Sequence, residues 1–134
     1  MPGNLRESSS IGSFLPLTGN YRCVTKDAAI DIKDAVHRDI EASRAVYNWV
    51  CGLCEKLGAS PNDLVPFEKY ASAALGLVRP SSAARALFAG APNIERVDRL
   101  VQGVAAQKGM RNAIVDETVA MVDARLAANR KAAA

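Results

Sequence analysis

Between Thr25 and Leu57 the chain places apolar residues every three or four positions, which is the spacing of one face of an α-helix. The stripe consists of Ala29, Ile32, Val36, Ile40, Ser43, Val46, Val50, Leu53 and Leu57. Thr25 is suited to cap the start of this helix and Gly58 to end it. The pattern predicts one amphipathic helix of about 50 Å, whereas a compact domain of this size is roughly 30 Å across. We therefore expect part of the helix to project and contact another molecule.

The second half of the chain predicts shorter helices separated by turn residues. The same spacing predicts helices over 66–78, 81–88, 93–108 and 111–130. The punctuating residues are Pro66 in a first turn, Ser81 or Ser82 and Asn93 as caps, and Gly90 and Gly109 as ends. With no strand pattern, the expected fold is all-α. It is a small helical bundle over 25–131 built on the long helix, followed by a frayed tail at 132–134.

Residues 1–24 have neither helical nor strand periodicity, and serine, glycine and proline are frequent among them. We expect an extended N-terminal arm that lies on its own bundle or on a neighbouring subunit. In the long helix, two aromatic residues flank the apolar stripe, where they either widen the buried face or anchor a partner, since such residues are frequent in interface hot spots. The candidates for partner contact or self-association are Phe14, Leu15, Tyr21, Tyr47 and Trp49.

Composition is that of one ordinary globular domain, with 134 residues, 49% hydrophobic and 23% charged. No run of eighteen apolar residues is present, so no membrane-spanning helix is predicted. The three cysteines are an odd number, which favours reduced thiols over a disulfide framework. The first residues lack a signal-peptide pattern, so we expect a cytoplasmic protein, or a virion component if the protein is viral.

Charge is distributed unevenly along the chain. Residues 1–67 hold seven Lys and Arg against eight Asp and Glu, whereas residues 68–134 hold ten against six, giving −1 and +4 within the total of +3. A basic half is typical of phosphate contact, although it also occurs on proteins that bind no nucleic acid. The candidate nucleic-acid-binding residues are Lys69, Arg79, Arg85, Arg96, Arg99, Lys108 and Arg111.

Three motifs resemble functional signals, but their surroundings in the sequence do not support that chemistry. Cys51 and Cys54 form a CxxC near the end of the long helix, where the dipole disfavours a thiolate, and His37 lies too far along the same helix to share a metal with them. Residues 15–19 match an LPxTG sorting signal but lack the apolar segment and basic tail that follow such signals. No serine or cysteine is placed as a nucleophile beside His37. We predict a protein without catalytic residues, metal site or cofactor.

Two resemblances are relevant to function. The segment 77–87, LVRPSSAARAL, resembles the helix–proline–short-helix corner of the small dimeric double-stranded-RNA-binding suppressors of insect nodaviruses. The layout of an arm followed by a small helical bundle is similar to that of coat proteins of filamentous viruses. The first resemblance covers a small part of the chain and the second is architectural. Neither assigns a role to an individual residue.

These observations lead to one hypothesis and two alternatives. The leading hypothesis is a non-enzymatic, self-associating helical protein that binds or packages nucleic acid, for example a filament coat protein. The first alternative is a helical adaptor or regulatory module that binds another protein through the region of Trp49. The second alternative is a small viral suppressor that binds double-stranded RNA.

Overall fold

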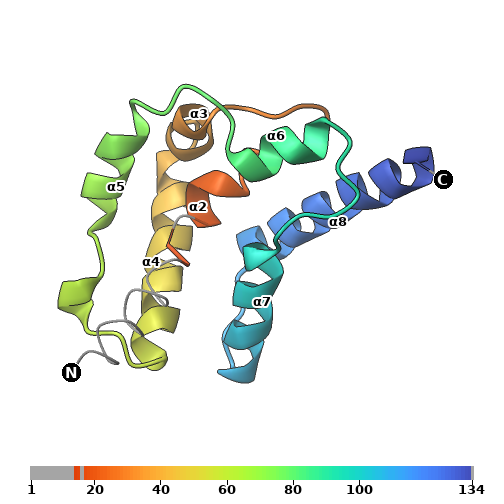
Figure 1. Ribbon diagram of the computed structural model, residues 1–134. Helices are drawn as coiled ribbons and strands as arrows, with labels where there is room; N and C mark the ends of the chain where they lie inside the picture. Colours follow the sequence, from red (N-terminus) through yellow and green to blue (C-terminus); the bar gives the residue numbers. More distant parts are fainter. Residues whose placement is uncertain (1–13, 16, 134) are drawn as a thin grey trace, which may run out of the picture.

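The computed structural model describes residues 14–15 and 17–133, and these residues are mostly helical (Figure 1). Between them lie α2 (Leu17–Asn20), α3 (Ile32–His37), α4 (Ile40–Lys56), the 3-10 turn η1 (Pro61–Asp63), α5 (Phe67–Ala74), α6 (Ser82–Phe88), α7 (Val97–Gln107) and α8 (Ala113–Ala133). The described residues contain no strand, and their isolated bridge joins Val24 to Ala29. The predicted all-α class is confirmed. No described helix combines the length and the apolar character needed to cross a membrane.

The single long helix predicted over 25–57 is wrong, because the structure divides this stretch into α3 and α4. Asp39 has φ −139° and ψ 86°, which interrupts the helix, and its carboxylate accepts a hydrogen bond from the amide of Ala42 at 3.1 Å as the N-cap of α4. The buried Ser43 hydroxyl donates to the carbonyl of Val36 at 2.7 Å, which satisfies the end of α3. With 17 residues, α4 is about 25 Å long. The expected projection therefore has no basis.

The other predicted helices are present with shifted ends. α5 ends at Ala74 rather than near 78, and α7 begins at Val97 rather than behind Asn93. Of the two caps considered for α6, Ser81 is the one used, and its side chain accepts from the amide of Ala84 at 3.2 Å. Gly58, Gly90 and Gly109, predicted as helix ends, all have positive φ. In the predicted frayed tail at 132–134, residues 132–133 belong to α8, which ends at Ala133, and residue 134 lies outside the described residues.

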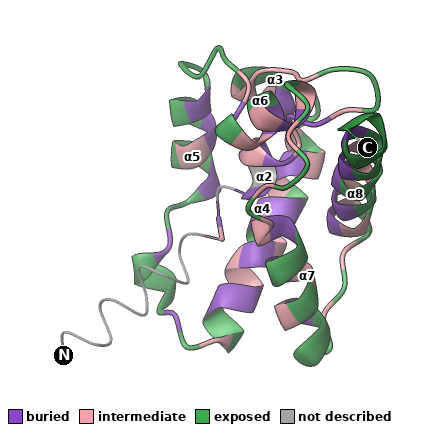
Figure 2. Cartoon of the chain, turned by 45° about the vertical axis from the view of Figure 1, so that its right-hand side comes forward, coloured by how far each residue is buried: buried purple, intermediate pink, exposed green. Residues whose placement is uncertain are grey.

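The core is organised on α4, which lies against α2, α3, α5 and α8. Its buried face consists of Ser43, Val46, Tyr47, Val50, Leu53 and Cys54. α7 packs on α8, and α8 also contacts α6, so the second half of the chain closes the other side of α4 (Figures 1 and 2). Small residues let these short helices approach closely.

The predicted arm over 1–24 is part of the bundle wherever it is described. Residues 17–20 form α2, which packs between α3, α4 and α6. Tyr21, Cys23 and Val24 follow it in the core with exposures of 6% or less. Of the two environments expected for the arm, the described part lies in its own bundle. Residues 1–13 lie outside the described residues.

Candidate interaction surface

One of the seven predicted nucleic-acid-binding cations, Arg96, is committed to the interior. Its guanidinium bonds both carboxylate oxygens of Asp98 at 2.9 Å and reaches Asp123 at 2.6 Å. Asp98 is fully buried and the Arg96 side chain is 16% exposed. Burial alone lowers the pKa of Arg96, but the hydrogen bonds that its guanidinium donates to these two carboxylates outweigh burial and raise the pKa. Arg96 neutralises a buried charge and is not available for phosphate.

The other six cations are exposed, but they come from several separate elements. They are Lys69 in α5, Arg79 before α6, Arg85 in α6, Arg99 in α7, Lys108 at the end of α7 and Arg111 before α8. None of the six forms an ion pair with another described residue. Arg79 and Arg85 line one hollow, whereas Arg111 lines another. The basic tract of the sequence is therefore divided in space.

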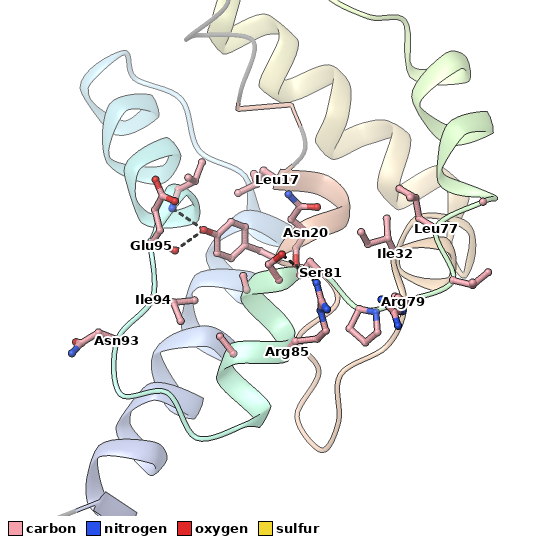
Figure 3. A pocket seen from close by; sticks show the side chains of 18 residues that line it. Leu17, Asn20, Ile32, Leu77, Arg79, Ser81, Arg85, Asn93, Ile94 and Glu95 are labelled. Carbon is pink, nitrogen blue, oxygen red and sulfur yellow. Dashed lines mark hydrogen bonds between the residues drawn. The ribbon is translucent and has the colours of Figure 1, made fainter.

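The larger hollow lies beside α6 and has a volume of about 750 Å³. Residues of α2, the start of α3, the connection 76–81, α6 and the segment 93–97 form its wall, and we call it the α6 hollow. Figure 3 shows Arg79 and Arg85 on one side of it and Asn93 and Glu95 on the other. Two cations and one carboxylate thus share an otherwise largely apolar lining.

Exposed apolar side chains are concentrated at the edge of this hollow. Leu75, Leu77 and Val78 are 50%, 47% and 66% exposed, and two of them line the hollow directly. They belong to the connection between α5 and α6, whose residues 75–79 we call the apolar loop. Among the described residues the other large hydrophobics of comparable exposure, Val65 and Leu100, are single and lie on other elements. Several exposed apolar residues within four positions of the chain, two of them lining one hollow, are more typical of an interaction surface than single ones, which are ordinary.

The apolar loop is held in place by its backbone. The carbonyls of Leu77 and Arg79 accept hydrogen bonds from the amides of Lys33 and Ile32, each at 3.0 Å. These amides belong to the first turn of α3, where no intrahelical acceptor exists for them. Just after the loop, Ser81 donates its hydroxyl proton to the carbonyl of Asn20 at 2.5 Å. The exposed side chains are consequently presented by an anchored backbone, which lowers the entropy cost of binding.

Beneath the hollow, Tyr21 joins the first described segment to the start of α7. Its hydroxyl donates to the carbonyl of Glu95 at 2.6 Å and accepts from the amide of Val97 at 3.1 Å (Figure 3). Burial raises the pKa of Tyr21, so the hydroxyl remains a donor at neutral pH. These two bonds hold residues 95–97 against the residue that follows α2, in the wall of the hollow.

The five residues predicted for partner contact do not form one surface. Leu15, Tyr21 and Tyr47 are buried at 6%, 6% and 1% exposure, so their side chains pack inside this chain. Tyr47 stacks on the ring of Tyr70 at 4.9 Å and donates to the carbonyl of Val65 at 2.6 Å. Phe14 and Trp49 are half-buried, and both pack against the core.

Trp49 also lines a second hollow of about 470 Å³ between α4, α7 and the start of α8. Arg111 is on the same wall, together with Gln102, whose amide donates to the Asp116 carboxylate at 2.9 Å. That carboxylate places a negative charge beside the single cation of this hollow. The second hollow thus combines weaker positive charge and less exposed apolar surface than the α6 hollow.

The three cysteine thiols and the imidazole of His37 are buried, half-buried or hydrogen-bonded within the fold. Burial raises the pKa of Cys54 to about 11 and also raises that of Cys51 and Cys23, so the thiols stay protonated at neutral pH. His37 lies with Nε2 2.7 Å from the carbonyl oxygen of Ala71, bridging α3 to α5. Over residues 14–15 and 17–133, no group of three or more His, Cys, Asp or Glu residues is arranged to hold a metal ion.

Sequence reasoning missed the apolar loop because the apolar spacing places Leu75 and Val78 on the buried stripe of a longer helix. The available signal was Gly76, which disfavours a helix interior. No protein-family model, curated protein or solved structure matches this chain.

Proposed function

We propose that this chain is a non-enzymatic protein-binding module whose docking surface is the apolar loop together with the α6 hollow. The observation that carries the proposal is the exposure of Leu75, Leu77 and Val78 on a backbone tied to α3 at the edge of a hollow. Exposing three neighbouring hydrophobic side chains to water is unfavourable unless a partner covers them. This proposal is the adaptor alternative predicted from the sequence, but its binding surface is the α5–α6 connection instead of the region of Trp49.

A protein partner accounts for the surface better than nucleic acid does. Phosphate contact requires cations but gains little from Leu77 and Val78, which dominate the exposed edge. Of the six exposed cations, Arg79 and Arg85 share the α6 hollow, whereas Arg111 lines the second hollow and the other three line neither, and Arg96 is neutralised within the chain. Nucleic-acid packaging, double-stranded-RNA binding and self-association remain predictions from the sequence.

The proposal is tested with a random peptide library displayed on phage and selected on the immobilised full chain. Selected peptides are labelled, and their affinities are measured by fluorescence anisotropy for the wild type and for Leu77→Ser/Val78→Ser. We expect at least roughly a tenfold loss of affinity in the variant, because two buried interface side chains contribute about 1 kcal/mol or more each.

Val65→Ser/Leu100→Ser is the matched control, since it removes one valine and one leucine that are each about half exposed on other elements. It should leave the affinities unchanged. Peptides that bind the wild type and Leu77→Ser/Val78→Ser equally, or a library from which no loop-dependent peptide emerges, would contradict the proposal. Unfolding curves of each variant establish that the fold is retained.

A further inference from the structure

We infer that the occupant of the α6 hollow is an acidic amphipathic helix of a partner protein. This inference rests on the proposed function and adds the chemistry of the partner. Its first support is charge: Arg79 and Arg85 lie on one side of the hollow and form no ion pair with any described residue (Figure 3). Among the described residues, the Arg85 guanidinium makes one hydrogen bond, at 3.4 Å to the Ser82 hydroxyl of its own helix.

Two guanidiniums without a described ion-pair partner, beside exposed leucine and valine side chains, define a mixed surface. A partner segment that covers Leu77 and Val78 brings its neighbouring positions to Arg79 and Arg85. Carboxylates at those positions would form charge-assisted hydrogen bonds, whereas cations would be repelled. Glu95, the carboxylate of the lining, lies on the opposite side of the hollow (Figure 3). The partner is therefore apolar on one face and acidic next to it.

Backbone geometry favours a helix over an extended strand as the occupant. A partner β-strand binds by adding to a sheet edge, and the described residues offer no strand to extend. In the apolar loop, the carbonyls of Leu77 and Arg79 are already bonded to the amides of α3. Binding must then use side chains, which is how a helix lies in a groove with its own backbone bonds satisfied.

A second copy of this chain is a poorer match for the hollow. The exposed hydrophobic residue that its described helices could offer is Leu100 of α7. Arg99 is its exposed neighbour in α7, so docking α7 would bring a third cation toward Arg79 and Arg85. Like charges at short distance oppose that arrangement.

The test uses the peptides selected on the full chain, resynthesised as matched pairs in which every Asp and Glu is replaced by Asn and Gln. We expect the selected set to be enriched in acidic residues spaced three or four apart, and to gain helical circular dichroism on binding. The neutral members should bind at least roughly fivefold more weakly to the wild type, because charge-assisted contacts are lost. That preference should fall below roughly twofold in Arg79→Gln/Arg85→Gln.

Arg99→Gln/Lys108→Gln is the control for net charge, since it removes two exposed cations of α7 and its C-terminal end and should preserve the preference. Charge reversal sharpens the test: Arg79→Glu/Arg85→Glu should prefer lysine-bearing versions of the same peptides.

Loop-dependent peptides with no acidic enrichment, or with no gain of helix, overturn this inference and leave the proposed function standing. Peptides independent of Leu77 and Val78 overturn the proposed function itself. A duplex RNA oligonucleotide that binds the wild type, loses affinity in Arg79→Gln/Arg85→Gln and ignores Leu77→Ser/Val78→Ser identifies the surface as a phosphate site and overturns both.

Discussion

Among the described residues, two regions near the α6 hollow differ in whether their side chains are buried and paired or exposed and unpaired. In the first region, Tyr21 connects the end of α2 to the start of α7, and Gly19 of α2 lies close to Tyr70 of α5. Arg96, beside Val97 at the start of α7, binds the buried Asp98, and we call this region the α2 junction. At the edge of the hollow, the apolar loop leaves leucine and valine exposed beside Arg79, which has no ion-pair partner among the described residues. The buried contacts of the junction stabilise the fold, whereas the loop is the surface that we propose to bind a partner. Substitutions in the two regions should therefore separate stability from binding.

The largest expected effect on stability comes from Arg96→Leu. Removing this guanidinium leaves the fully buried Asp98 carboxylate without its charge partner. Breaking a buried pair in this way costs about 3–5 kcal/mol, because an uncompensated charge stays in a low dielectric. Urea unfolding followed by circular dichroism measures the change.

Arg96→Leu/Asp98→Leu serves as the control and should recover much of the loss, since the buried carboxylate is then absent as well. Arg79→Gln/Arg85→Gln, from the exposed edge, should change stability by less than about 0.5 kcal/mol. If Arg96→Leu lowered the free energy of unfolding no more than Arg79→Gln/Arg85→Gln, the charged residues of the two regions would not differ in their contribution to stability.

Gly19→Ala should destabilise the junction by about 1–3 kcal/mol through overpacking. A Cβ at this position of α2 would collide with the hydroxyl of Tyr70 and crowd Ile32 and Val36. Because the collision is with one hydroxyl, Tyr70→Phe in the same chain should restore part of the stability. Thermal unfolding of the two single variants and of the double variant measures this coupling.

Tyr21→Phe should cost about 1–2 kcal/mol, since the amide of Val97 and the carbonyl of Glu95 lose a buried partner. Its pH dependence is a separate readout. The folded state raises the pKa of Tyr21, mainly by burial, so this contribution is complete below pH 10 and is lost as the pH rises above it. The stability difference between the wild type and Tyr21→Phe should therefore narrow above pH 10. A difference that widens there contradicts the assignment of the bond.

Features that depend on neighbouring residues in the chain could be predicted from the sequence, whereas features that depend on tertiary packing could not. Periodicity and the Gly58, Gly90 and Gly109 ends follow from the chain itself, so the helical class and most helices were predictable. The apolar stripe continues across Asp39, so periodicity alone predicts no break in the helix there. The break and the capping bond of Asp39 depend on how α3 and α4 pack.

The same limit applies to the candidate interaction surface. Arg96 and Arg79 look alike in sequence, because only the fold places the buried Asp98 carboxylate against one guanidinium and leaves the other without an ion pair to any described residue. Val78 likewise continues an apolar stripe until the helix ends at Ala74. Predicting these two environments requires the positions of α7 and α8 around Arg96 and of α3 beside the apolar loop.

The smallest expected effect on stability belongs to the apolar loop, and it is the most informative. Leu77→Ser/Val78→Ser should change the free energy of unfolding by less than about 0.5 kcal/mol, because both side chains are already about half exposed or more and the anchoring bonds use the Leu77 and Arg79 carbonyls. Urea unfolding measures this. A loss above about 2 kcal/mol would mean that the loop supports the fold as the α2 junction does, and the exposed side chains would then need no partner to explain them. Near-neutral stability combined with lost peptide affinity is the outcome that assigns the two regions their separate roles.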